Sequence, residues 1–215
     1  MKPSQLEYIL TTLDDFEVPD ITLEQYATTP HIASYIFQQI EDHYDGIAGK
    51  VVADLGCGCG TLALGAELSG AGFCVGFEID ENTIKIANRN KKDLGCDNVD
   101  FIQCDVLELR NHTRWHKVFD TVIMNPPFGT KWNEGIHLQF LEAAFSLARR
   151  TVYSLHKTST DKKIQKLAEQ WGVKMNAIYE VKYNLDKSYK FHKENSKDIS
   201  VTVFKFDIPE EIKSL

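Results

Sequence analysis

The stretch VVADLGCGCG at residues 51–60 decides the fold of this chain. Its first five residues form an apolar run typical of a buried strand, and glycines follow at positions 56, 58 and 60. Glycines at the turn from a strand into a helix let a ligand approach the backbone closely. Because position 61 is Thr, the pattern is not G-x-G-x-x-G, and a tight turn without a ligand remains an alternative.

Strand and helix patterns alternate on both sides of this stretch. Apolar runs predict strands at residues 51–55, 73–79, 99–103, 119–124, 151–155, 174–183 and 199–206. Helical spacing predicts helices at residues 4–13, 31–44, 62–68, 81–94, 137–148 and 160–171. The alternation favours an α/β fold with a mostly parallel sheet and helices on both faces. The last two strands have no helix between them, which predicts an antiparallel hairpin at one edge.

The length of 215 residues favours a single domain. We expect residues 1–46 to form a helical N-terminal extension and residues 47–215 to form a Rossmann-like core. Within the extension, Thr29 suits the N-cap of the helix at residues 31–44, and Pro30 suits its first turn.

Composition predicts a protein of the cytosol or nucleus. The longest apolar runs are too short to cross a bilayer, and residues 1–5 do not lead into an apolar signal region. The five cysteines show no paired C-x-x-C spacing of the kind that binds zinc. We interpret them as buried free thiols in a reducing compartment and predict no metal site.

Charge is distributed unevenly along the chain. The net charge of −7 argues against a generic nucleic-acid binder. Residues 149–197, however, contain 12 Lys and Arg against 5 Asp and Glu, so this segment carries +7 and the remainder −14. A basic C-terminal third could present one face to phosphates, although solvated helix faces would explain the same charges.

Acidic residues follow the second and third predicted strands. Glu78, at the tip of the second strand, can accept hydrogen bonds from both hydroxyls of a ribose. Asp80 is better placed to cap the helix that follows. Asp105 could accept the amino group of an adenine while Val106 packs on the ring, although an ordinary loop aspartate would look the same. A nicotinamide dehydrogenase also needs an acid at the second strand and is a distant alternative.

The sequence Asn125-Pro126-Pro127-Phe128 follows the fourth predicted strand and suggests chemistry on a planar NH2 group. The Asn125 side-chain oxygen and the Pro126 carbonyl can accept both N–H bonds of one amino group. The prolines fix φ and hold these acceptors in place. The ring of Phe128 offers a face on which a flat base or amide can stack.

Together these motifs resemble a class I S-adenosylmethionine-dependent methyltransferase. They are DLGCGCG at residues 54–60, GFEID at 76–80, CD at 104–105 and NPPF at 125–128. A closer resemblance, over nearly the whole chain, is to the methyltransferase-like protein five family, the eukaryotic small-subunit ribosomal RNA adenine-N6 methyltransferases. That resemblance rests on residues 23–26, 51–60, 122–131, 152–157 and 188–193.

The closer resemblance implies methyl transfer from S-adenosylmethionine to the N6 amino group of an adenosine in small-subunit (18S) rRNA. It also implies the seven-stranded class I methyltransferase fold, with the N-terminal extension contributing to the cofactor site. The implied partner is the small zinc-binding activator of the tRNA methyltransferase 112 type, which pairs with a sheet edge in that family. The implied locations are the nucleus, including the nucleolus, and the cytoplasm.

Carried over by position, the resemblance implies a set of cofactor contacts. They are Gln25, Thr28, Asp54, Gly56, Cys59, Thr61, Glu78, Asp105 and Val106. Thr61 and Glu78 depart from the Val and Asp expected at these positions. Both changes are conservative, because position 61 is expected to act through its backbone and Glu78 keeps the carboxylate.

Basic and aromatic residues after the later strands are the candidate RNA contacts. The loop at residues 129–135 could close over a flipped base while its lysine, Lys131, meets a phosphate. Residues 188–193 alternate aromatic and basic side chains, a pattern that can stack bases and neutralise phosphates. The candidates are Lys131, His156, Lys157, Tyr189, Lys190, Phe191, His192 and Lys193. A mobile loop and a solvated hairpin loop are the plain alternatives.

Two other functions remain open on these residues. The Asn-Pro-Pro-aromatic motif also serves methyltransferases of guanine-N2 and of the glutamine side-chain amide, since both substrates present a planar NH2 group. A non-catalytic partner with the same fold would be a second class, although the complete glycine turn, Glu78 and residues 125–128 argue against it.

Overall fold

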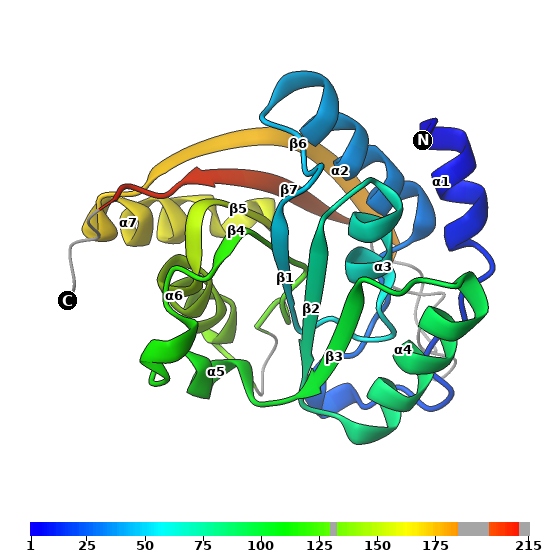
Figure 1. The fold of residues 1–215 in the computed structure, drawn as a ribbon. Helices are drawn as coiled ribbons and strands as arrows, with labels where there is room; N and C mark the ends of the chain where they lie inside the picture. Colours follow the sequence, from blue (N-terminus) through cyan, green and yellow to red (C-terminus); the bar gives the residue numbers. More distant parts are fainter. Residues whose placement is uncertain (130–132, 185–197, 211–215) are drawn as a thin grey trace.

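The computed structural model describes residues 1–129, 133–184 and 198–210. Its centre is a seven-stranded sheet with the order β3-β2-β1-β4-β5-β7-β6 (Figure 1). Neighbouring strands are parallel except where β7 pairs with β5 and β6. The predicted mostly parallel sheet with an antiparallel C-terminal pair is therefore confirmed, with β6 at the edge and β7 inserted beside β5.

The seven strands match the predicted ones in number and order. They are β1 Val51–Leu55, β2 Phe73–Glu78, β3 Val99–Gln103, β4 Phe119–Met124, β5 Ala148–Lys157, β6 Lys174–Asn184 and β7 Asp198–Asp207. Strand β5 extends beyond the predicted 151–155 at both ends. Its first residue pairs with Phe119 of β4 and its last with Val201 of β7, so tertiary pairing lengthens it.

Seven α-helices accompany the strands within the described ranges. They are α1 Pro3–Leu10, α2 Pro30–His43, α3 Thr61–Leu68, α4 Glu81–Leu94, α5 Val106–Leu109, α6 Ile136–Leu147 and α7 Asp161–Trp171. The predicted cap of α2 is confirmed, because the Ile32 N–H donates to Thr29 Oγ1 at 3.3 Å. Helix α1 ends at Leu10 rather than at the predicted Leu13. Directly after Leu10, the hydroxyls of two threonines donate hydrogen bonds to main-chain carbonyls of the helix.

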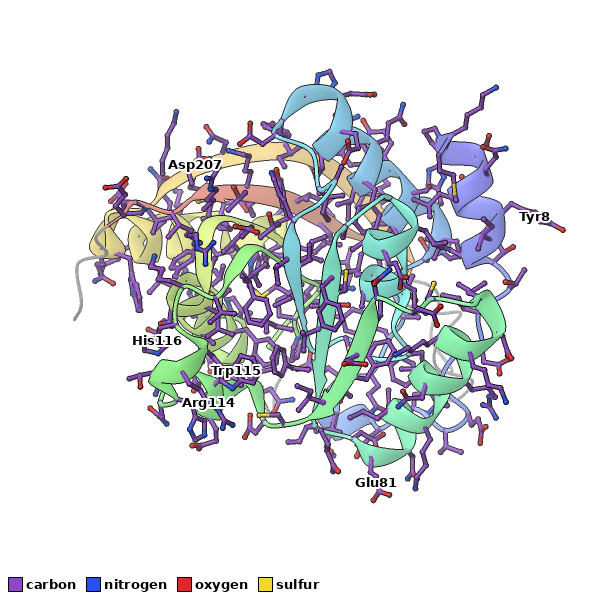
Figure 2. All side chains as sticks on the ribbon, viewed as in Figure 1. Tyr8, Glu81, Arg114, Trp115, His116 and Asp207 are labelled. Carbon is purple, nitrogen blue, oxygen red and sulfur yellow. The ribbon has the colours of Figure 1, made fainter. Side chains whose placement is uncertain are left out.

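Side chains alternate between two apolar cores on the two faces of the sheet. One core joins α1, α2 and α3 to strand residues such as Val52 and Ile123. The other joins α5, α6 and α7 to the neighbouring residues Ala53 and Val122. This period-two alternation follows from the pleat and explains why the inner strands are apolar on both faces. Outside these cores, Tyr8 projects from the outer side of α1 (Figure 2).

The parallel register brings the carboxyl ends of β1, β2, β3 and β4 to one edge of the sheet. The strand order reverses between β1 and β4, and ligands bind at such reversals in open α/β sheets. Among the helices described here, none is both long and apolar enough to span a bilayer.

Candidate active site

A cavity opens at this carboxyl edge. Its walls come from the loops after β1, β2, β3 and β4, from α6 and from the N-terminal segment before α2. The lining residues are Phe16, residues 22–28, Gly56, Cys57, Gly58, Cys59, Thr61, Glu78, Ile79, residues 104–107, Asn125, Pro127, Asn133, Ile136 and Phe140. All the predicted cofactor contacts except Asp54 are among them.

The glycine turn after β1 needs its glycines. Gly56, Gly58 and Gly60 have φ angles of 69°, 53° and 93°, a region that L-residues rarely adopt. A Cβ at Gly58 would also lie 3.0 Å from the ring of Phe16, and one at Gly56 would lie 3.1 Å from Phe140. The turn therefore presents bare backbone to the cavity, as the sequence predicts.

Asp54 corrects one prediction. Its carboxylate is 2% exposed and does not line the cavity. Oδ2 instead accepts the N–H of Ala63 in the first turn of α3 at 2.9 Å. Burial raises the pKa of Asp54 to about 8, with the charge of Glu78 acting in the same direction. Asp54 thus fastens β1 to α3, and its assignment as a direct cofactor contact is wrong for this structure.

Glu78 lies at the cavity wall and also holds the glycine turn. Its Oε2 accepts the Gly58 N–H at 3.0 Å, while Oε1 accepts the Ile79 and Asp80 N–H groups at 2.9 and 3.1 Å. Burial raises its pKa even though these amides favour the charged form. A carboxylate accepts about four hydrogen bonds. Glu78 can therefore accept a hydrogen bond from about one ribose hydroxyl, unless one of the three amide hydrogen bonds breaks.

The N-terminal segment is tied to the same edge through Gln25. Its Oε1 accepts the Asp20 N–H at 2.7 Å, and its Nε2 donates to Asp80 Oδ2 at 2.9 Å. Asp80 also caps α4 by accepting the Asn82 N–H at 2.9 Å, as predicted. Gln25 lines the cavity, but its amide anchors the segment that covers the site.

Asp105 has a capping role that the sequence did not reveal. Its Oδ1 accepts the Leu107 N–H at 2.9 Å and begins the short helix α5. Asp105 is exposed, whereas Val106 is buried. Both residues line the cavity, and their contact with an adenine stays a prediction.

Asn125 supplies an unusual feature of the site. Its Nδ2 donates to Thr28 Oγ1 at 3.0 Å, which fixes the amide against the N-terminal segment. Its Oδ1 is buried, and within the described part of the chain it has no hydrogen-bond partner. Buried polar atoms are nearly always paired, so an orphaned acceptor beside a cavity indicates a donor on a bound ligand.

The rest of the turn differs from the prediction. Phe128 is 4% exposed, so neither face of its ring is open to a base. Tyr26 stacks on it with the ring centroids 4.9 Å apart and the planes 23° apart. The Tyr26 hydroxyl also donates to the Pro126 carbonyl at 2.8 Å. The sequence analysis treated Tyr26 only as part of a family signature and missed this contact.

Two buried histidines lie behind the turn. His156 is 1% exposed, contacts Ser154 Oγ at 2.7 Å, and has its pKa lowered to about 3 by burial. Its ring lies 5.8 Å from that of His137, whose Nδ1 is 2.9 Å from the position of a Cβ on Gly129. Contact between His156 and RNA is therefore ruled out by burial, because β5 continues past the predicted end and directs this ring inward.

The other RNA candidates divide into two groups. Lys131 and residues 189–193 lie outside the described residues. Lys157 is partly exposed, and its ammonium lies 5.7 Å from the Phe128 ring centroid, so it remains near the turn. Among residues 1–129, 133–184 and 198–210, no three His, Cys, Asp or Glu side chains are grouped to hold a metal ion.

Known proteins resemble this chain over nearly its whole length. A family profile described as a methyltransferase domain matches residues 48–207. The chain is 52% identical to the rRNA N(6)-adenosine-methyltransferase METTL5 of Danio rerio, covering 96% of this chain and 99% of that protein. It is 48% identical to the Drosophila melanogaster protein of the same description, over 98% and 99% of the two chains.

A solved structure extends the comparison. The crystal structure of a putative RNA methyltransferase from Pyrococcus horikoshii superposes with a TM-score of 0.81 at 28% identity, covering 97% of this chain and 96% of that one. The likeness therefore includes the N-terminal segment as well as the sheet.

Proposed function

The chain belongs to the rRNA N6-adenosine methyltransferase family, and from this premise we propose that it methylates adenosine N6 in small-subunit (18S) rRNA with S-adenosylmethionine as methyl donor. The observation that carries the proposal is the buried Oδ1 of Asn125 at the end of β4, which has no hydrogen-bond partner among the residues that the structure describes. An adenine amino group is a donor of the kind this oxygen lacks.

The cavity fits the proposed cofactor. Positive-φ glycines leave room where side chains would intrude, and Glu78 offers an acceptor at the tip of β2. Gly56, Cys59 and Thr61 would hold the methionine end, Glu78 the ribose, and Asp105 and Val106 the adenine. Gln25 and Thr28 would close the site from the N-terminal segment. When bound, S-adenosylmethionine supplies an electrophilic methyl group.

Asn125 and Pro126 orient the nucleophile. The N6 lone pair is delocalised into the adenine ring, which makes the amino group a poor nucleophile. Acceptors for both N–H bonds direct the lone pair out of the ring and favour the pyramidal nitrogen that forms during transfer. Such groups act most strongly on the transition state when they are fixed beforehand. Thr28 provides that fixation by holding the Asn125 amide.

No dedicated base is required for the proton. Methylation makes the nitrogen cationic, and it then loses a proton readily to water. The target base must leave its stack to enter the pocket, as other base-modifying enzymes require. We assign Lys157, which lies beside the turn, and Lys131 to the phosphates that flank the flipped base.

We further propose a heterodimer with a small zinc-binding activator of the tRNA methyltransferase 112 type. An exposed sheet edge is a general site for strand addition. Strand β3 offers such an edge, because β2 is its neighbour on one side and no described strand lies on the other. Location in the nucleus, nucleolus and cytoplasm is part of the same proposal, since rRNA is processed and used there.

The test is transfer of a labelled methyl group to small-subunit rRNA by the chain co-purified with its activator, followed by nucleoside analysis. Label in N6-methyladenosine that disappears with Asn125→Ala would support the proposal. Label in guanosine or in protein would replace the substrate and keep the chemistry. Binding of S-adenosylmethionine without transfer to free rRNA or to pre-ribosomal particles would reject the catalytic proposal.

A further inference from the structure

Tyr26 makes two contacts that the Asn-Pro-Pro-Phe motif predicts for the target base. Its ring stacks on Phe128 at 4.9 Å, and its hydroxyl donates to the Pro126 carbonyl at 2.8 Å. A flipped adenine would stack on the same ring and donate an N–H to the same oxygen. A phenol thus shares two features with the base, a flat ring and a hydrogen-bond donor attached to it, whereas the adenine amino group has a second N–H for Asn125.

The two sets of contacts compete for space. A carbonyl oxygen can accept two hydrogen bonds, so Pro126 could in principle serve both groups. The ring of Phe128 cannot, because it is only 4% exposed and a base needs an open face. A base can therefore stack on Phe128 only after a neighbour has moved, and among the described residues Tyr26 stacks on this ring.

We propose that Tyr26 occupies the position of the target base in the free enzyme and that the flipped adenine displaces it. The inference rests on the proposed function, since it takes adenine as the incoming group. Tyr26 is then a gate that excludes weaker stacking groups from the pocket. An incoming group must replace both a stacking contact and a hydrogen bond before it reaches the methyl donor.

The anchoring of the segment makes this displacement local. Gln25 is held by Asp20, Asp80 and Thr83, and Thr28 is held by Asn125. Residues 25–29 form neither helix nor strand, so Tyr26 lies outside regular secondary structure, between these two anchors. Cofactor contacts at Gln25 and Thr28 would stay in place while the Tyr26 ring moves.

The decisive variant is Tyr26→Phe, which keeps the ring and removes the hydroxyl that occupies Pro126. We expect the KM for rRNA to fall about 2- to 10-fold, the value of one hydrogen bond, with kcat and cofactor affinity unchanged. The matched control is Tyr35→Phe, whose ring stacks on Tyr179 at 4.2 Å outside the cavity. An unchanged or raised KM, or a reduced kcat, would overturn the inference.

A second measurement reads the position of the ring directly. In chain labelled with 3-fluorotyrosine, Tyr26→Phe identifies the Tyr26 signal, and Tyr8, which is 73% exposed, provides the reference for a solvated ring. Addition of rRNA with S-adenosylhomocysteine should move the Tyr26 signal toward that reference. Suppose that the rRNA binds and that, in a separate assay with S-adenosylmethionine, it is methylated at N6. An unmoved Tyr26 signal would then overturn the gate but not the proposed function. Methyl label on guanosine or protein would instead overturn the proposed function, and that substrate would replace rRNA in the same titration.

Discussion

Asn125→Ala separates the chemistry of the site from its architecture. The substitution removes Oδ1, which lacks a partner in the described part of the chain, and the hydrogen bond that Nδ2 donates to Thr28 Oγ1 at 3.0 Å. Loss of a neutral hydrogen bond costs about 0.5–1.5 kcal/mol of stability, and removal of an unsatisfied buried oxygen offsets part of it. The folded state should therefore be nearly as stable as before.

Activity should respond much more strongly. Removing one preorganised partner of a developing charge typically lowers kcat by about 100- to 1000-fold. Six of the eight proposed cofactor contacts that line the cavity lie at the carboxyl ends of β1, β2 and β3. The Kd for S-adenosylmethionine should accordingly change by less than about threefold, below the value of one average hydrogen bond.

The assay is single-turnover methyl transfer to rRNA, with cofactor affinity measured by calorimetry on the same preparation. Asn98→Ala is the matched control, because it removes an exposed Asn that contacts Glu67 away from the cavity. Equal losses of transfer and of cofactor affinity would mean that the turn is structural. Retention of transfer within tenfold would refute the role of Oδ1 as an acceptor.

Three further predictions follow from buried groups. Gly65→Ala should destabilise the fold by about 1–3 kcal/mol in urea, because the new Cβ would lie 2.5 Å from the Phe37 ring; a gain of about 1 kcal/mol from helix propensity would show that α2 shifts freely. Asp54 has a pKa of about 8 in the folded protein, above its usual 3.8. Between these two pH values the native state binds more protons than the unfolded state, so the contribution of Asp54 to stability falls as pH rises from 3.8 to about 8. Asp54→Asn should flatten the decline of Tm between pH 5 and 8, and parallel profiles would contradict this. The ring resonances of His156 should keep neutral shifts down to pH 5, and titration near pH 6.5 would mean that water reaches the ring.

The sequence was most informative where local chemistry acts alone. The alternation of apolar runs predicted all seven strands in order, and Thr29 and Asp80 fixed the beginnings of α2 and α4. The glycine turn and the acid at position 78 predicted which loops would meet at the cavity. These features depend on backbone conformation and on residues a few positions apart, so they can be inferred without knowing the fold.

The errors arose where distant segments meet. Nothing local in residues 23–28 indicates that Tyr26 lies on Phe128, because the contact joins residues about a hundred positions apart. His156 follows an apolar run at a predicted strand end, and only the pairing of β5 with β7 shows that the strand continues and buries it. Asp54 belongs to the sequence motif of a cofactor loop, yet its carboxylate accepts a hydrogen bond from the first turn of α3.

The insertion of β7 between β5 and β6 affects how the chain is made. Strand β6 pairs with β7 and not with β5, although it leaves the ribosome first. During synthesis, β5 therefore has an unpaired edge until residues 198–207 have emerged from the ribosome. Strand β6 has no pairing partner during the same period. Unpaired strand edges are templates for aggregation. The nascent chain thus passes through a stage at which a chaperone that shields strand edges would raise the yield of folded enzyme.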